Sequence, residues 1–261
     1  MFESIASQRV TTHDFDQFPI PFRAIATDIV NGEMVVMADG ELSMAMRASM
    51  AVPGVFDPVR HDNHLLVDGG LVRNLPVDVA RNMGADVIIA VDVGTKLASE
   101  SEITNAVAIV YQMTGILTVS NTDLQIKTLA DTDVLIAPKL GNDVSSADFD
   151  KLDLAIPLGY AAANAVEEQL QAYSLSEQEY HTWRQQVDRC VEGPPRVHFI
   201  QLDNQSRFSD EVIMNLVSIK PGENLDLEQL DHDLRQIYGL GFIRLARYDI
   251  IKRDGVEAVS Y

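Results

Sequence analysis

The chain has 261 residues and carries 20 basic and 39 acidic side chains, a formal net charge of −19 at pH 7. This acidity argues against nucleic acid as a partner and against simple electrostatic docking on anionic lipid. The single cysteine, Cys190, excludes an internal disulfide and a cysteine-based zinc site, and no apolar run approaches the length of a transmembrane helix.

The first predicted elements form a strand hairpin followed by a helix. Residues 22–29 are predicted to form a strand, residues 31–32 (Asn-Gly) a tight turn, and residues 34–37 the return strand. A short helix is expected over residues 41–50, because the Pro-Gly pair at 53–54 interrupts any longer one.

An acidic residue then stops an apolar strand. Residues 64–67 are predicted to form this strand, which ends at Asp68 and is followed by Gly69 and Gly70. Such a pattern places a carboxylate at the tip of a buried strand. The glycines permit positive φ and the close approach of another segment.

The following region alternates helices and strands. Pro76 is expected in the first turn of a helix that ends near Met83. The apolar runs at 86–91 and 134–137 are typical of parallel strands covered on both faces. Further helices are predicted at 102–129, 150–172 and 176–190. The fold class is therefore α/β, with a sheet sandwiched between helices.

A Gly-Pro-Pro sequence at 193–195 indicates a boundary, so we expect domains at 1–192 and 193–261. The second domain is predicted as βααββ. Its elements are a strand at 197–202, a helix capped by Ser209, a helix at 226–238, and strands at 242–250 and 256–261.

Three motifs around Asp68 resemble the bacterial patatin-like phospholipases. They are Arg-Ala-Ser-Met-Ala-Val-Pro-Gly-Val-Phe-Asp-Pro-Val at 47–59, Asp-Gly-Gly at 68–70 and Asn-Leu-Pro at 74–76. The resemblance implies a lipid acyl-ester hydrolase with a Ser–Asp dyad. In this dyad Asp68 is the base, Gly69 and Gly70 shape the turn, and neither a metal nor another cofactor is needed. A phospholipid or another acyl ester is the implied substrate.

The chain departs from that family at the nucleophile. The family's Gly-x-Ser-x-Gly elbow and its glycine-rich oxyanion loop both precede the aspartate, and neither motif occurs in these 261 residues. Ser43 and Ser49 lack the glycine-flanked elbow that a nucleophile requires. We therefore expect Met1 to lie inside the enzyme domain, which then lacks its N-terminal nucleophile segment, and the chain alone to be inactive.

The βααββ region, with Tyr-Gly-Leu-Gly-Phe at 238–242, resembles a polypeptide-transport-associated (POTRA) domain. A patatin-like domain followed by POTRA resembles patatin-type V autotransporters. This implies a secreted bacterial parent with a periplasm-facing POTRA domain and an outer-membrane barrel as partner. The chain itself shows neither a signal-peptide pattern at its start nor a membrane-spanning segment.

Other readings remain open or are disfavoured. The chain could be a non-catalytic remnant that binds polypeptide through the exposed strand edges of residues 196–261, or that module could be a spacer. His13 with Asp16, and His61 with His64, could bind a metal, but their spacing matches no recognised ligand pattern. A nucleotide-binding domain is disfavoured, because no glycine-rich phosphate loop follows a strand.

Overall fold

The computed structural model describes residues 13–94, 96–140, 152–189, 196–243, 246, 248–253 and 256–260. They form two compact units. One comprises Arg23–Met37 and Met44–Tyr180, and the other takes in His181–Tyr261 with the described residues of Met1–Phe22 and Ala38–Ser43. The predicted boundary after residue 192 falls outside the described residues and stays a prediction.

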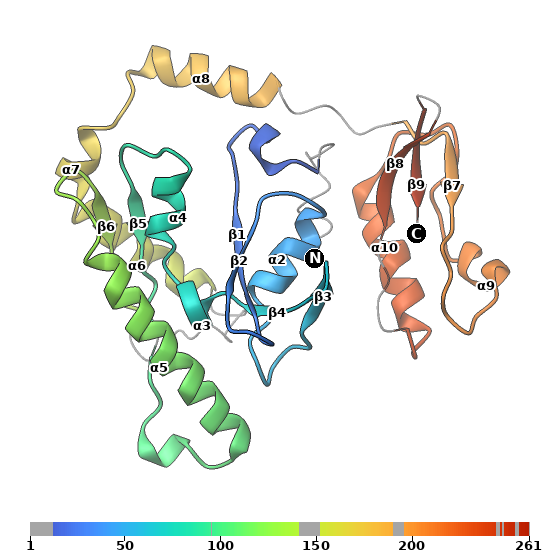
Figure 1. Ribbon diagram of the computed structural model, residues 1–261. Helices are drawn as coiled ribbons and strands as arrows, with labels where there is room; N and C mark the ends of the chain where they lie inside the picture. The colour runs from blue at the N-terminus through green and yellow to red at the C-terminus, as the bar shows by residue number, and fades with distance from the viewer. Residues whose placement is uncertain are drawn as a thin grey trace. The chain divides into compact units, whose positions relative to one another are not determined.

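A four-stranded antiparallel sheet organises the first unit (Figure 1). Its strands, in the order β2-β1-β4-β3, are β2 (Met34–Met37), β1 (Ala24–Asp28), β4 (His64–Asp68) and β3 (Val59–His61). All five residues of β1 are buried. The predicted hairpin is confirmed, since β1 and β2 pair antiparallel and Gly32 between them has φ +75°.

Strand β3 was not predicted from the sequence. Asp62 and Asn63 have φ values of 45° and 67° and join β3 to β4 in a tight hairpin. Asp and Asn tolerate this left-handed backbone better than most residues do. His61 ends β3 and His64 begins β4, and His64 Nδ1 lies 2.8 Å from Asp28 Oδ2.

Helices accompany these strands, so the mixed α/β class is confirmed. They are α2 (Leu42–Ser49), α3 (Gly70–Arg73), α4 (Val77–Asn82), α5 (Ala106–Ile126), α6 (Leu152–Asn164) and α7 (Glu167–Gln171), with the 3-10 turn η2 (Glu100–Glu102). The 3-10 turn η1 (Phe15–Gln17) and most of α8 (Glu177–Arg189) belong to the other unit. The one-turn helix α3 was not predicted. The single helix expected over 150–172 is divided into α6 and α7.

Strands β5 (Ile89–Val91) and β6 (Val134–Ile136) form a separate parallel pair. The parallel pairing agrees with the prediction, and β6 is buried or half-buried throughout, but burial on both faces was wrong for β5. Ile89 and Val91 are each 50% exposed, whereas Ala90 between them is buried. Within the described residues β5 pairs with β6 alone, and this apolar face of β5 is half-exposed.

Asp133 ties the start of β6 to its neighbours. Its carboxylate accepts the N–H of Ala130 and of Ile88, each at 2.8 Å, and contacts Arg81 Nη2 at 2.5 Å. The Ala130 N–H is the largest of the influences that hold the pKa of Asp133 below its usual value, and the Ile88 N–H and the Arg81 charge add to it. A carboxylate with a lowered pKa stabilises the fold above its unfolded-state pKa, and this contribution is lost as pH falls through the folded-state pKa.

We therefore expect Asp133→Ala to lower the melting temperature at pH 7 by several degrees and to have less effect at pH 3. Asp131→Ala, which changes an exposed aspartate two residues away, serves as the matched control. Thermal unfolding followed by circular dichroism measures both variants. An equal effect of the two substitutions would contradict a specific role for Asp133.

The second unit contains the predicted βααββ order. Its elements are β7 (Phe199–Gln201), α9 (Asp210–Met214), α10 (Leu227–Gly239), β8 (Asp249–Arg253) and β9 (Val256–Ser260), and the sheet order is β7-β9-β8. Ser209 caps α9 as predicted, accepting the N–H of Val212. The strand expected from residue 242 begins only at Asp249. Gly241 and Phe242 adopt φ values of 71° and 62°, which are incompatible with extended backbone.

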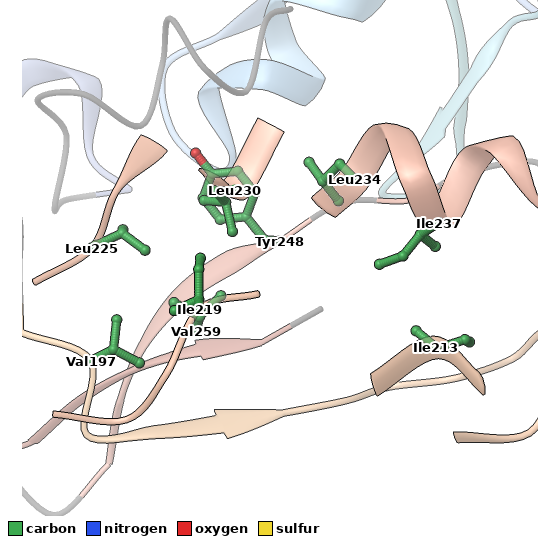
Figure 2. Packing of buried hydrophobic residues seen from close by; sticks show 9 residues of the cluster. All are labelled: Val197, Ile213, Ile219, Leu225, Leu230, Leu234, Ile237, Tyr248 and Val259. Carbon is green, nitrogen blue, oxygen red and sulfur yellow. The ribbon is translucent and has the colours of Figure 1, made fainter. Parts of the chain in front are cut away.

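A small apolar core holds this second unit together (Figure 2). One side of α10 supplies Leu230, Leu234 and Ile237, which Figure 2 shows along the helix. The remaining members are Val197, Ile213, Ile219, Leu225, Tyr248 and Val259, and every residue in the cluster is 7% exposed or less. The spacing of the α10 residues is the helical pattern expected from the sequence.

Candidate active site

Strand β4 brings Asp68 to the edge of a well-packed core. Leu66 and Val67, directly before it, are 0% and 2% exposed. The N–H of Asp68 donates to the Ala51 carbonyl at 3.0 Å, and its carbonyl accepts the Thr27 hydroxyl at 2.9 Å. The main chain of Asp68 is therefore held both by the neighbouring strand β1 and by the segment that follows α2.

The carboxyl of Asp68 is partly buried and has one hydrogen bond. The Gly70 N–H donates to Oδ1 at 2.6 Å, and within the described residues Oδ2 accepts none. Burial raises the pKa of Asp68 above its usual value, and the Gly70 N–H opposes this rise. Arg73, the cation of α3, pairs with Asp78 at 3.2 Å. The site thus contains a carboxylate that is more basic than an exposed aspartate.

Gly69 and Gly70 leave little room for a side chain, whereas their backbone angles would allow other residues. A Cβ at Gly69 would lie 2.3 Å from the carbonyl oxygen of Ile25, and one at Gly70 would lie 2.9 Å from Asp68 Oδ1. Gly69 has φ −65° and Gly70 begins α3, so neither takes the positive φ that the sequence suggested. The sequence also suggested that another segment approaches these glycines closely, and the structure confirms this for Gly69, which lies against the backbone of Ile25.

A row of buried polar side chains on α5 reaches this turn and was missed from the sequence. The row consists of Thr118, Asn121, Thr122 and Gln125. Thr118 and Asn121 both donate to the Gly70 carbonyl, at 3.1 and 2.7 Å. The available signal was their spacing of i, i+3, i+4 and i+7 in an otherwise apolar helix.

Of the other residues considered from the sequence, Ser49 reaches this turn through its main chain, while Ser43 and His64 make other contacts. Ser43 donates to the carboxylate of Glu41, and the Ser49 carbonyl accepts the Gly69 N–H at 3.4 Å. His64 pairs with Asp28 at the end of β4 opposite Asp68. In the part of the chain that the structure describes, no three His, Cys, Asp or Glu side chains gather as metal ligands.

Two family models match the chain. Residues 3–81, which include Asp68, Gly69 and Gly70, match the model of patatin-like phospholipase. Residues 195–259 match the POTRA model described as surface antigen variable number repeat. The described helices include none with the length and apolarity needed to cross a bilayer.

Several known proteins are similar to part of the chain. Patatin-like phospholipase domain-containing protein 7 of Mus musculus is 43% identical over 106 residues, which cover 40% of this chain and 8% of that protein. Patatin-like phospholipase domain-containing protein 6 of Homo sapiens is 46% identical over 79 residues, which cover 30% of this chain and 6% of that protein. An NTE family protein of Mycobacterium tuberculosis is 45% identical over 76 residues, 29% and 21% of the two chains.

The chain therefore spans a small part of the length of the relatives that it matches. The family matches lie in the order expected from the motifs, and the described residues around Asp68 form a mixed α/β fold. The chain is thus similar to patatin-like phospholipases over residues 3–81 and to the POTRA family over residues 195–259.

Proposed function

We propose that residues 1–192 form the C-terminal part of a lipid acyl hydrolase domain, in which Asp68 is the base of a Ser–Asp dyad. The observation that carries this proposal is the state of the Asp68 carboxyl. It is partly buried, Oδ1 is held by the Gly70 N–H, and within the described residues Oδ2 has no hydrogen-bond partner. A carboxylate of raised pKa with one oxygen available is suited to accept a proton at neutral pH.

In the proposed reaction a serine outside these 261 residues attacks the ester. Its Oγ bonds to the acyl carbon as its proton passes to Asp68 Oδ2, and the bond to the alcohol breaks as that proton leaves with the alcohol. Water then repeats the sequence on the acyl-serine, which releases the fatty acid and restores the serine. Backbone donors that stabilise the oxyanion would come with the serine segment.

The uncovered apolar surface of the first unit supports the presence of a further segment. Helix α5 is inverted relative to an ordinary surface helix, because its buried row is polar and its outer residues are apolar. Together with Ile89 and Val91 of β5, the exposed set on α5 is Val107, Ile109, Val110, Tyr111, Met113, Ile116, Leu117 and Leu124. An apolar area of this extent is normally covered by other protein, and a parallel strand pair is normally covered on both faces.

The direct test fuses to residue 1 the segment of a patatin-like relative that contains Gly-x-Ser-x-Gly. We expect the fused protein to hydrolyse a p-nitrophenyl acyl ester, and its serine-to-alanine variant to be inactive. The same fusion should bind several-fold less of the dye 1-anilinonaphthalene-8-sulfonate than the 261-residue chain, because the added segment covers the α5 and β5 surface.

The two measurements separate the parts of the proposal. A fusion that folds but hydrolyses no ester would contradict the assignment of Asp68. A fusion that is active but binds as much dye as the original chain would support the role of Asp68 and contradict the claim that the added segment covers α5.

A second candidate function is polypeptide binding by the βααββ unit within a secreted bacterial outer-membrane protein that carries a barrel. The observation in its favour is the three-stranded sheet, in which β7 and β8 are the outer strands among the described residues. An outer strand can pair with an extended segment. Binding of unfolded peptides to the chain, competed by a β7-sequence peptide, would support it, and a chain that binds none would exclude it.

A further inference from the structure

The buried face of α5 makes hydrogen bonds instead of apolar contacts. Thr118, Asn121, Thr122 and Gln125 are between 5% and 9% exposed. Each has a partner in the segment from Gly70 to Asp78. Buried polar side chains are costly unless they are paired, so a row of paired side chains fixes the elements that it joins.

Asn121 holds both ends of the one-turn helix α3. Its Nδ2 donates to the Gly70 carbonyl at 2.7 Å and to the Leu117 carbonyl of its own helix at 2.9 Å. Its Oδ1 accepts the N–H of Asn74 at 2.8 Å. A four-residue helix has little stability of its own. The hydrogen bonds of Asn121 to Gly70 and Asn74, called here the Asn121 clamp, therefore account for the fixed geometry of α3.

Gly70 is the link between this clamp and the Asp68 carboxyl. Its carbonyl receives the Thr118 and Asn121 donors, and its N–H donates to Asp68 Oδ1. The Gly69 carbonyl, in the same peptide plane as the Gly70 N–H, accepts the N–H of Val72 and of Arg73 at 3.1 and 2.8 Å. Because glycine is permissive about φ and ψ, the bonds to the Gly70 carbonyl are needed to fix the next plane relative to that one. A Cβ at Gly70 would lie 3.4 Å from Thr118 Oγ1, which shows how closely the two elements pack.

We propose that Asn121, aided by Thr118, is a positioning residue for the base of the dyad. By fixing the Gly70 carbonyl it helps to hold the Gly70 N–H on Asp68 Oδ1, so that Oδ2 is the oxygen left to accept a proton. The proposal rests on the proposed function for its catalytic meaning, but the structural link from Asn121 to Asp68 can be tested without any activity.

The test uses nuclear magnetic resonance on the 261-residue chain. The carboxyl carbon of Asp68 and the amide proton of Gly70 are followed against pH, and exchange of the Gly70 amide hydrogen is timed. In Asn121→Leu we expect the Asp68 midpoint to move to higher pH, because a hydrogen bond to the carboxylate is weakened. We also expect the Gly70 amide to exchange about tenfold faster.

Gln125→Leu is the matched control. Gln125 is equally buried on the same face and accepts a backbone N–H, that of Asp78 at 3.0 Å, one turn beyond Asn121. This variant should lose similar stability while the Asp68 midpoint and the Gly70 exchange rate stay as in the unmodified chain. Equal changes in the two variants would overturn the proposal.

Thr118→Val keeps the test decisive if Asn121→Leu does not fold. It removes one of the two donors to the Gly70 carbonyl with little change of shape. We expect the same directions of change as for Asn121→Leu, with a smaller amplitude. An unchanged Asp68 midpoint together with unchanged Gly70 exchange would refute the clamp, whether or not the chain proves to be part of a hydrolase.

Discussion

Replacing Asp68 by asparagine is expected to reduce ester hydrolysis by the fused, serine-bearing protein by roughly 10²- to 10⁴-fold, the usual contribution of a positioned general base. The amide has nearly the shape of the carboxylate, and its oxygen still accepts the Gly70 N–H that now donates to Oδ1. Only the ability to take a proton from the nucleophile is lost, so the loss should appear in kcat with little change in KM.

The same substitution should make the protein more stable at neutral pH. Because burial raises the pKa of Asp68, the folded chain binds this proton more tightly than the unfolded chain does. The resulting stability is complete below the unfolded-state pKa and is lost as pH rises through the folded-state pKa. Asp68→Asn removes this loss, so we expect a gain of about 1 kcal/mol at pH 7 that disappears near pH 3.

Urea unfolding at the two pH values measures this gain, and steady-state kinetics measure the activity. A variant that is both inactive and less stable than the original at pH 7 would point to damage of the fold. A variant that keeps full activity would remove Asp68 from the reaction.

Gly69→Ala is the second substitution with a large expected effect. The added Cβ would lie 2.3 Å from the Ile25 carbonyl oxygen and 2.7 Å from its carbon. Both atoms belong to the buried backbone of β1, which cannot move away as a flexible side chain can. We expect a loss of about 3 kcal/mol in the free energy of unfolding, the upper range for overpacking of a core.

Gly159→Ala is its control, because it makes the same chemical change within α6 where a Cβ would meet nothing within 4 Å. Alanine is the better helix former, so this variant should gain up to about 1 kcal/mol. Chemical denaturation of the two variants checks the contrast. Similar stabilities for both would show that the approach of β1 to Gly69 is not a tight constraint.

The sequence identified the elements whose signals are local. The Asn31-Gly32 hairpin, the cap at Ser209 and the apolar row of α10 are each specified by residues close together in the sequence, and the structure contains all three. Strand β3 was missed because its turn, Asp62-Asn63, lacks the glycine that usually marks a tight hairpin.

By itself, the sequence determined that Asp68 ends an apolar strand, that two glycines follow it, and that a βααββ unit comes last, since each depends on neighbours along the chain. Only the tertiary structure decided how these parts act on one another. Asn121 lies 51 residues from Gly70, and the Ile25 carbonyl that excludes a side chain at Gly69 lies on another strand. Hydrogen bonds and close contacts between distant segments depend on packing, which no local pattern encodes.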